Sequence, residues 1–482
     1  MILTAIILTI ILTPLSILIY LNLKYPEPHW DWNKIDTTVT FPKGFLWGVA
    51  TSAHQVEGGC DNNNWSEWER AVDESGKPRI KNGQRAGRAC DHWNRYREDI
   101  ALMLRLGVRA YRFSVEWSKI EPRRGELNEA ALRHYQDLSE DLVAAGIEPM
   151  VTLHHFTNPV WFEKAGAFEK EENIAEVVAF ALRVFDALNG KVRFWCTINE
   201  PDVYAAQGYF TGLFPPGKKD PHLAGLVLWN MLQAHDAIYH ALKGRSVDPI
   251  EIGIVKNVFQ FDPFNRWSLL DWRVSRTLNQ LFNDSILSYL KDGHFRFKSP
   301  GMKSDLDKWA PEAKQVPQVQ VPGPGPQRAG RLRPALDFIG LNYYSHLNVR
   351  FQRGSPNFFG FAYRPEEVRT DMTYTIYAEG FYGAIHEVAK IGVPIFVTEN
   401  GIADFSDDRR ELFLRQYLFA MRRAMDEGCD LRGYFYWSLM DNFEWTEGYD
   451  MKFGLFEVDV ENQARSLRAG SKYFVEVVTP VG

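Results

Sequence analysis

The sequence predicts an α/β fold, a (β/α)8 TIM barrel, preceded by a single transmembrane helix at the N-terminus. From about Thr40 onward, short β-rich runs alternate with longer helical patterns, and this alternation occurs eight times. Before it, residues 2–23 contain no charged side chain. An uncharged stretch of this length is enough to cross a bilayer as a helix, so it predicts the transmembrane segment.

The N-terminal stretch, residues 1–24, is interpreted as a membrane anchor. No basic residue precedes the apolar run and no small-residue cleavage site follows it before Lys24, so a cleaved signal peptide fits less well. Residues 25–40 are polar and contain proline, which predicts a linker, and residues 41–482 form the barrel. We therefore expect a single-pass membrane protein, and the few charges that flank the helix leave the orientation of the barrel open.

The eight predicted strands are short runs rich in β-branched and aromatic residues. They begin at Phe45, Ala110, Glu148, Phe194, Glu251, Asp337, Pro394 and Leu431. Between the second and third runs, Asn128 can cap a helix that Gly146 can end, and apolar residues at helical spacing predict that it packs on the barrel. A Pro- and Gly-rich stretch at about 310–334 cannot maintain regular hydrogen bonding, and predicts a long loop before the sixth strand.

Composition excludes several classes of partner. The formal net charge is -6 and basic residues are scattered, so we expect no nucleic-acid partner. The four cysteines have no metal-site spacing, which predicts free thiols, although a bridge between Cys60 and Cys90 stays open. The oligomeric state is not indicated.

Two carboxylates stand at the ends of predicted strands: Glu200 in "TINEP" and Glu399 in "TENG". In a parallel barrel every strand delivers its last residues to the same rim, so we expect these side chains to meet there. Paired carboxylates indicate acid–base or nucleophilic chemistry. A separation of about 5 to 5.5 Å fits a retaining glycosidase and about 6.5 to 9.5 Å an inverting one, and the sequence leaves this separation open.

The motifs "TINEP", "DFIGLNYYS", "TENG" and "WSLMDNFEWTEGYDMKFG" occur in this order, and together they resemble glycoside hydrolase family 1, the β-glucosidase family. The resemblance spans roughly residues 41–475. It implies a retaining β-glycosidase that removes terminal non-reducing β-D-glucosyl residues by double displacement, with galactosyl or fucosyl residues as alternatives. It also implies a β-glycoside as the partner, and neither cofactor nor metal.

The resemblance assigns Glu200 as acid/base and Glu399 as nucleophile. Arg112 would pair with Glu399 and Asn342 would support the site. The residues expected to bind substrate are Gln55, His155, Asn199, Tyr344, Trp437, Glu444 and Trp445. Asp202 stands where relatives often carry an aromatic residue, which leaves the aglycone preference open, and this aspartate could simply cap the next helix.

One function of a different class remains: a catalytically weak, membrane-anchored sugar-binding or co-receptor-like protein on the same barrel. Such relatives typically lack a catalytic glutamate, whereas Glu200 and Glu399 are both present here. Hydrolysis of a chromogenic β-glucoside separates the two functions.

Overall fold

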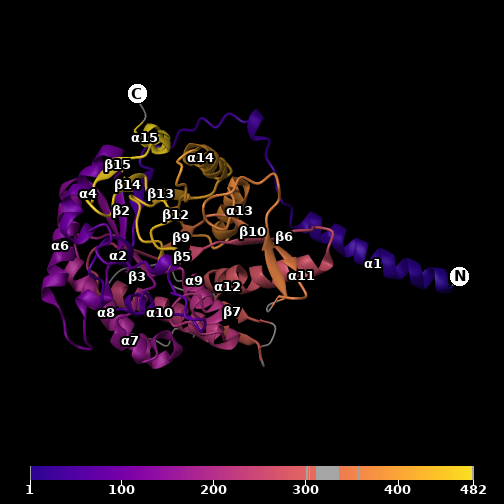
Figure 1. The fold of residues 1–482 in the computed structure, drawn as a ribbon, viewed down its shortest axis with the longest axis horizontal. Helices are drawn as coiled ribbons and strands as arrows, with labels where there is room; N and C mark the ends of the chain where they lie inside the picture. The colour runs from indigo at the N-terminus through magenta and orange to yellow at the C-terminus, as the bar shows by residue number, and fades with distance from the viewer. Residues whose placement is uncertain (1, 300–301, 303, 311–335, 356–357, 480–482) are drawn as a thin grey trace, which may run out of the picture.

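Eight parallel strands form a closed barrel in the computed structural model, as the sequence predicted (Figure 1). The structure describes residues 2–299, 302, 304–310, 336–355 and 358–479, with side chains described from Leu12 onward. The barrel strands are β1 (Leu46–Ala50), β2 (Ala110–Ser114), β3 (Glu148–His154), β4 (Phe194–Asn199), β5 (Glu251–Asn257), β9 (Phe338–Asn342), β12 (Ile395–Asn400) and β13 (Leu431–Trp437). They pair in this order, and β13 returns to β1.

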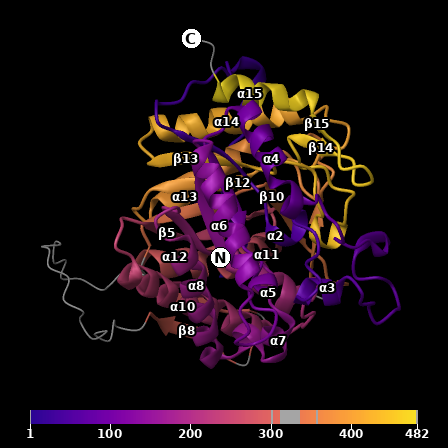
Figure 2. The same cartoon turned by 90° about the vertical axis from the view of Figure 1, so that its left-hand side faces the viewer.

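Helices that connect consecutive strands cover the outside of the barrel (Figure 2). The longest are α4 (His92–Leu106), α6 (Glu129–Ala144), α8 (Ile174–Leu188), α10 (Pro221–Arg245), α13 (Ala378–Ala389) and α14 (Arg410–Asp426). Helix α6 confirms its sequence prediction: the Asn128 side chain accepts from the backbone N–H groups of Ala130 and Ala131, and the periodic apolar residues are buried. The cap and the apolar stripe together explain why this segment is helical and which face it buries.

The barrel interior is filled with apolar side chains near the beginnings of the strands. Phe194, Phe338 and Phe396 stand at or next to the first residues of β4, β9 and β12. The Phe396 ring centroid lies 5.3 Å from that of Phe194 and 5.1 Å from that of Phe338. These rings fill the N-terminal end of the barrel. Because the strands are parallel, the polar side chains at their C-terminal ends lie together at the opposite rim.

Additional segments surround that rim. After β4, the short helix α9 (Pro201–Ala205) continues into the π-helix η5 (Ala206–Thr211). Between β5 and β9 lie β6 (Gln260–Pro263), α11 (Leu269–Asn279), the π-helix η6 (Gln280–Asp284), α12 (Ser285–Asp292), β7 (His294–Phe297) and β8 (Leu306–Trp309). Strand β6 pairs with β10 (His346–Phe351), which pairs with β11 (Phe359–Ala362). These segments extend the walls of the rim beyond the strand ends.

Shorter elements complete the connections: α2 (Ala53–Val56), α3 (Asn64–Trp68), α5 (Trp117–Ile120), α7 (Val160–Lys164), β14 (Phe456–Val458), β15 (Arg465–Leu467) and α15 (Lys472–Val478). The Pro- and Gly-rich loop predicted at about 310–334 lies outside the described residues, apart from its first position. All four cysteines are free thiols, so Cys60 and Cys90 are not bridged.

The predicted membrane anchor is not supported. Helix α1 (Ile2–Lys24) points away from the barrel in Figure 1, and its C-terminal turns contact α11. There, Asn22 donates to the backbone carbonyl of Arg266, whose guanidinium donates to the Asn22 side chain at 2.7 Å. Among the described residues, no helix is long and apolar enough to span a membrane. The prediction of a single-pass membrane protein anchored by residues 1–24 is therefore wrong: an uncharged run of sequence was taken for a spanning helix, whereas its described end makes polar contacts with the barrel.

The segment expected to be a linker, residues 25–40, also contacts the barrel. The carboxylate of Glu27 is buried and pairs with Arg266 and Arg364. The backbone N–H of Trp30 donates to Glu379 at 2.8 Å, and the indole N–H of Trp32 donates to the same carboxylate. The division of the chain at residues 24 and 40 stays a prediction from the sequence.

Candidate active site

A cavity of about 460 Å³ opens at the C-terminal rim of the barrel. Seven of the eleven predicted site residues line it: His155, Glu200, Tyr344, Glu399, Trp437, Glu444 and Trp445. The other four, Gln55, Arg112, Asn199 and Asn342, are fully buried behind them and hydrogen-bond to lining residues or to one another. The structure therefore brings all eleven predicted residues together at the C-terminal rim.

Glu399 is paired with a cation and with a hydroxyl. It is the penultimate residue of β12, and its Oε1 lies 2.5 Å from Nη1 of Arg112, a residue of β2. The hydroxyl of Tyr344 donates to Oε2 of the same carboxylate at 2.7 Å. A buried guanidinium and a phenol that both donate to one carboxylate stabilise its negative charge.

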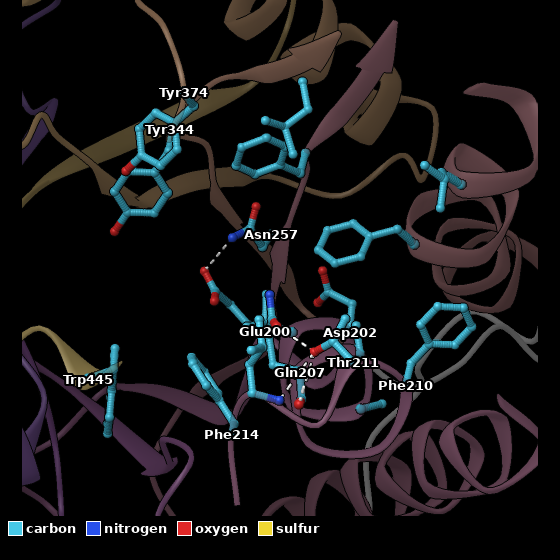
Figure 3. Close-up of a pocket in the computed structure, with 18 of the residues that line it drawn as sticks. Glu200, Asp202, Gln207, Phe210, Thr211, Phe214, Asn257, Tyr344, Tyr374 and Trp445 are labelled. Carbon is cyan, nitrogen blue, oxygen red and sulfur yellow. Dashed lines mark hydrogen bonds between the residues drawn. The ribbon is translucent and has the colours of Figure 1, made fainter. Parts of the chain in front are cut away.

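Glu200 has a different environment. Its backbone has φ of +44°, at the point where β4 ends and Pro201 begins α9. Its Oε1 accepts from the amide of Asn257 at 3.0 Å, drawn as a dashed line in Figure 3, and from the amide of Asn342 at 2.7 Å. Burial, and then the charge of Glu399, raise the pKa of Glu200 well above its usual value. One cavity thus holds a cation-paired carboxylate and a carboxyl that favours its protonated form.

A buried network connects the two glutamates and fixes a tautomer. Arg112 can only donate, and its Nη2 lies 2.6 Å from Asn199 Oδ1, so the amide group of Asn199 faces the other way. That amide donates to Nε2 of His155 at 3.1 Å. Burial lowers the pKa of His155 well below its usual value, so the ring is neutral, with its proton on Nδ1. The Nδ1–H group is buried without a partner among the described residues and is available to a ligand.

The remaining predicted residues form a polar and aromatic corner. The Gln55 amide donates to Glu444 Oε2 at 3.1 Å and to the backbone carbonyl of Phe443 at 2.8 Å. Burial raises the pKa of Glu444 to about 8. The His155 ring lies nearly parallel to Trp437 and Trp445, with centroid distances of 5.9 and 6.1 Å. Gln55 therefore orients Glu444, while Glu444 and the two indoles face the cavity.

Sequence reasoning missed Asn257 and Lys256, which end β5. Lys256 and Asp202 are fully buried and form an ion pair of 2.8 Å. Asp202 does not cap α9, whose cap position is Glu200, so that expectation was wrong. The signal was available, because "IVKNV" places polar residues at the end of a predicted strand, as "TINEP" and "TENG" do.

Comparison with known proteins agrees with this geometry. A model of glycosyl hydrolase family 1 matches residues 37–482. The chain belongs to this family. It is similar to β-glucosidase A of Thermotoga maritima, with 33% identity over 452 residues, which cover 91% of this chain and 97% of that protein.

Two solved structures have the same architecture. A β-glycosidase from Pyrococcus horikoshii is 36% identical with a TM-score of 0.78, and the match covers 91% of this chain and 95% of that one. A family 1 β-glucosidase from Thermotoga maritima is 30% identical with a TM-score of 0.79, covering 91% and 98%. The chain is therefore an O-glycosyl hydrolase, a β-glycosidase, and the purely sugar-binding alternative is set aside.

Proposed function

We propose that this β-glycosidase is a retaining β-glucosidase in which Glu399 is the nucleophile and Glu200 the acid/base. The observation that carries the proposal is the unequal environment of the two carboxyl groups in one cavity. Arg112 and Tyr344 stabilise charge on Glu399. Burial and that same charge raise the pKa of Glu200. The names of similar proteins, which are β-glucosidases, support glucose as the sugar.

In the first step, a carboxylate oxygen of Glu399 attacks the anomeric carbon, and the bond from that carbon to the aglycone oxygen breaks. Glu200 gives its proton to the departing oxygen. Because Oε1 of Glu200 accepts from both Asn257 and Asn342, the proton resides on Oε2. The products are a free alcohol and a glucosyl ester of Glu399.

In the second step, water takes the place of the departed alcohol, and Glu200 acts as a base instead of an acid. The ester on Glu399 carries no negative charge, so the second cause of the raised pKa of Glu200 is removed. Glu200 then accepts a proton from the water that attacks the anomeric carbon, and Glu399 leaves as a carboxylate. Two displacements at one carbon retain its configuration.

The polar corner holds the sugar. Glu444 can donate or accept near neutral pH because its pKa is raised to about 8. His155 offers the N–H of Nδ1, and Trp437 offers a flat face. Asn199, held between Arg112 and His155, lies next to the acid/base and suits contact with the sugar 2-hydroxyl. Glucosyl, rather than galactosyl or fucosyl, is the sugar that we propose.

The proposal is tested with Glu399→Ala in the presence of azide. We expect turnover of 4-nitrophenyl β-D-glucoside to fall by at least about 10⁴-fold, because the covalent route is lost. Azide should restore the release of nitrophenol and form a glucosyl azide of α configuration. Glu457→Ala, which changes an exposed glutamate, is the matched control and should retain full activity. Unchanged activity of Glu399→Ala, or an inverted sugar as the first product of the unaltered enzyme by NMR, would contradict the mechanism.

A further inference from the structure

The cavity does not end at the two glutamates but continues into a second, apolar part. Figure 3 shows Glu200 near its middle, with Trp445 on one side and Phe210 on the other. We call the side of Phe210 the phenylalanine end. It comprises the partly accessible lining residues Phe210, Phe259, Phe282, Phe359, Phe361 and Leu278. Phe282 belongs here because its ring centroid lies 4.7 Å from the ammonium of Lys256, which pairs with Asp202 on this side of the cavity (Figure 3). The others adjoin it: Phe259 through Phe261 of β6, and Leu278 of α11 and the two phenylalanines of β11 because α11 and β11 lie against β6 and β10. Large apolar side chains that stay accessible inside a cavity favour an apolar ligand.

One wall of the phenylalanine end follows directly from the acid/base. Val203, Ala206 and Phe210 line the cavity, and they are spaced three and four residues apart on the continuous helical segment α9–η5. Residues at this spacing share one face of a helix. The segment that begins at Glu200 therefore leads an apolar stripe away from the acid/base.

A second wall begins at the other glutamate. Tyr344, which donates to Glu399, has its ring centroid 6.3 Å from Tyr374, which in turn lies 5.8 Å from Phe259. From Phe259 the ring contacts continue to Phe261 at 6.2 Å and from Phe261 to Phe282 at 5.6 Å. A series of neighbouring aromatic rings thus runs from Tyr344, beside the reacting carboxylate of Glu399, to Phe282 at the phenylalanine end.

Few polar groups near the phenylalanine end are free: among the described residues that line the cavity, the buried acceptors without a partner are Asp202 Oδ1 and Asn257 Oδ1. The hydroxyl of Thr211 donates to the side-chain carbonyl of Gln207 at 2.8 Å (Figure 3), and Asp202 pairs with Lys256. A second sugar ring placed here would bury hydroxyl groups that need new hydrogen bonds, at a cost in binding free energy. An aliphatic chain needs none and gains from contact with the rings.

We infer that the phenylalanine end binds the aliphatic chain of the aglycone, so that the preferred substrates are β-glucosides of medium-chain alcohols. The inference rests on the proposed function, because the sugar must lie against Glu444 and Trp445 for the chain to point the other way. The reaction is hydrolysis. The bond between the anomeric carbon and the alkoxy oxygen breaks, and water supplies a hydroxyl group to the sugar and a proton to the alcohol.

The test is a series of alkyl β-D-glucosides from methyl to octyl, assayed below the concentrations at which they aggregate, with 4-nitrophenyl β-D-glucoside and cellobiose beside them. We expect kcat/KM to rise by about fourfold for each added CH2 group until the chain fills the cavity, and by roughly a hundredfold or more in total. Most of the rise should appear as a lower KM. Cellobiose should be a poorer substrate than octyl glucoside.

The variant Phe210→Asn tests whether the gain in kcat/KM with chain length comes from the phenylalanine end. It should lower the octyl-to-methyl ratio of kcat/KM by about tenfold, because the change places a polar group on the apolar wall. Hydrolysis of methyl glucoside should persist, which also shows that the variant is folded. Phe405→Asn is the matched control: Phe405 is 70% exposed, lies outside the cavity lining, and should leave the ratio unchanged.

The outcomes separate the two proposals. Hydrolysis of nitrophenyl glucoside with no gain along the alkyl series would overturn the chain-binding inference and leave the β-glucosidase intact. A gain that Phe210→Asn does not reduce would place the chain outside the phenylalanine end and overturn the assignment. Hydrolysis of no β-glucoside at all would overturn both.

Discussion

The two ends of the cavity are built from different parts of the fold. At the polar end, Glu200 and Glu399 stand at the ends of barrel strands and are held by buried hydrogen bonds from Arg112, Asn257 and Asn342. At the phenylalanine end, the side chains come from segments that follow the strands, namely α9–η5, the residues directly after β5, α11, η6 and β11. The closed barrel positions the reacting groups, and the added segments shape the space for the leaving group.

The two ends of the cavity should also differ in how they respond to amino-acid substitutions. The groups of the polar end share partners, so that altering one disturbs several. The phenyl rings of the phenylalanine end make no hydrogen bonds, so altering one leaves no polar partner unpaired. We therefore expect substitutions at the polar end to change the chemistry, and substitutions at the phenylalanine end to change the choice of substrate.

The largest effect is expected for Glu200→Gln, at the polar end of the cavity, on the rate of the first step. An amide cannot protonate the leaving oxygen, so glucosylation by alkyl glucosides should slow by about 10² to 10⁴-fold. Glucosides with a very acidic aglycone, such as dinitrophenol, need no such proton and should react almost normally in single-turnover experiments. Equal losses across a series of aglycone pKa values would show that Glu200 only positions the substrate.

A smaller effect is expected at the boundary between the two ends, where Lys256 and Asp202 are buried as a pair. Lys256→Met leaves a buried carboxylate without its cation, which costs about 3 to 5 kcal/mol of stability. The midpoint of thermal unfolding should fall by at least about 3 °C.

Combining Lys256→Met with Asp202→Leu removes both charges and should recover most of that loss. Arg432→Met, which breaks an exposed pair with Asp430, is the matched control and should change the midpoint very little. If the double variant were as unstable as Lys256→Met alone, the unpaired charge would not be the cause.

The smallest effect concerns pH. Glu200 must be protonated in the first step, so kcat/KM falls as the pH rises through its pKa. The amide of Asn342 donates to Glu200 and favours its charged form, which lowers the pKa of Glu200. Asn342→Ala should therefore raise this pKa and move the basic limb of the kcat/KM profile to higher pH. Asn462→Ala, at an exposed asparagine, should leave the limb in place, and an unmoved limb in Asn342→Ala would contradict the role of the amide.

The sequence was sufficient to predict the barrel and most of the polar end, although Asn257, which donates to Glu200, was missed. Parallel strands buried on both faces appear as apolar runs, and a charge such as Glu399 directly after such a run is conspicuous. The phenylalanine end was not predicted, because Phe210, Phe282 and Phe359 lie on added elements between the barrel strands, and no pattern in the sequence shows that these elements meet. The apolar N-terminal run was misinterpreted for a related reason: composition reports hydrophobicity, whereas contacts such as that between Asn22 and Arg266 depend on the folded chain.

The central claim, that Glu399 is the nucleophile of a retaining reaction, is tested most directly by trapping the covalent intermediate. The enzyme is incubated with 2-deoxy-2-fluoro-β-D-glucosyl fluoride, digested, and its peptides are identified by mass spectrometry. The 2-fluorine slows both steps, whereas the good fluoride leaving group speeds only the first, so the covalent intermediate accumulates. We expect one fluoroglucosyl group on the peptide that contains Glu399, formed as activity is lost. A label on the peptide that contains Glu200, or an enzyme that hydrolyses β-glucosides and yet acquires no label, would contradict the account.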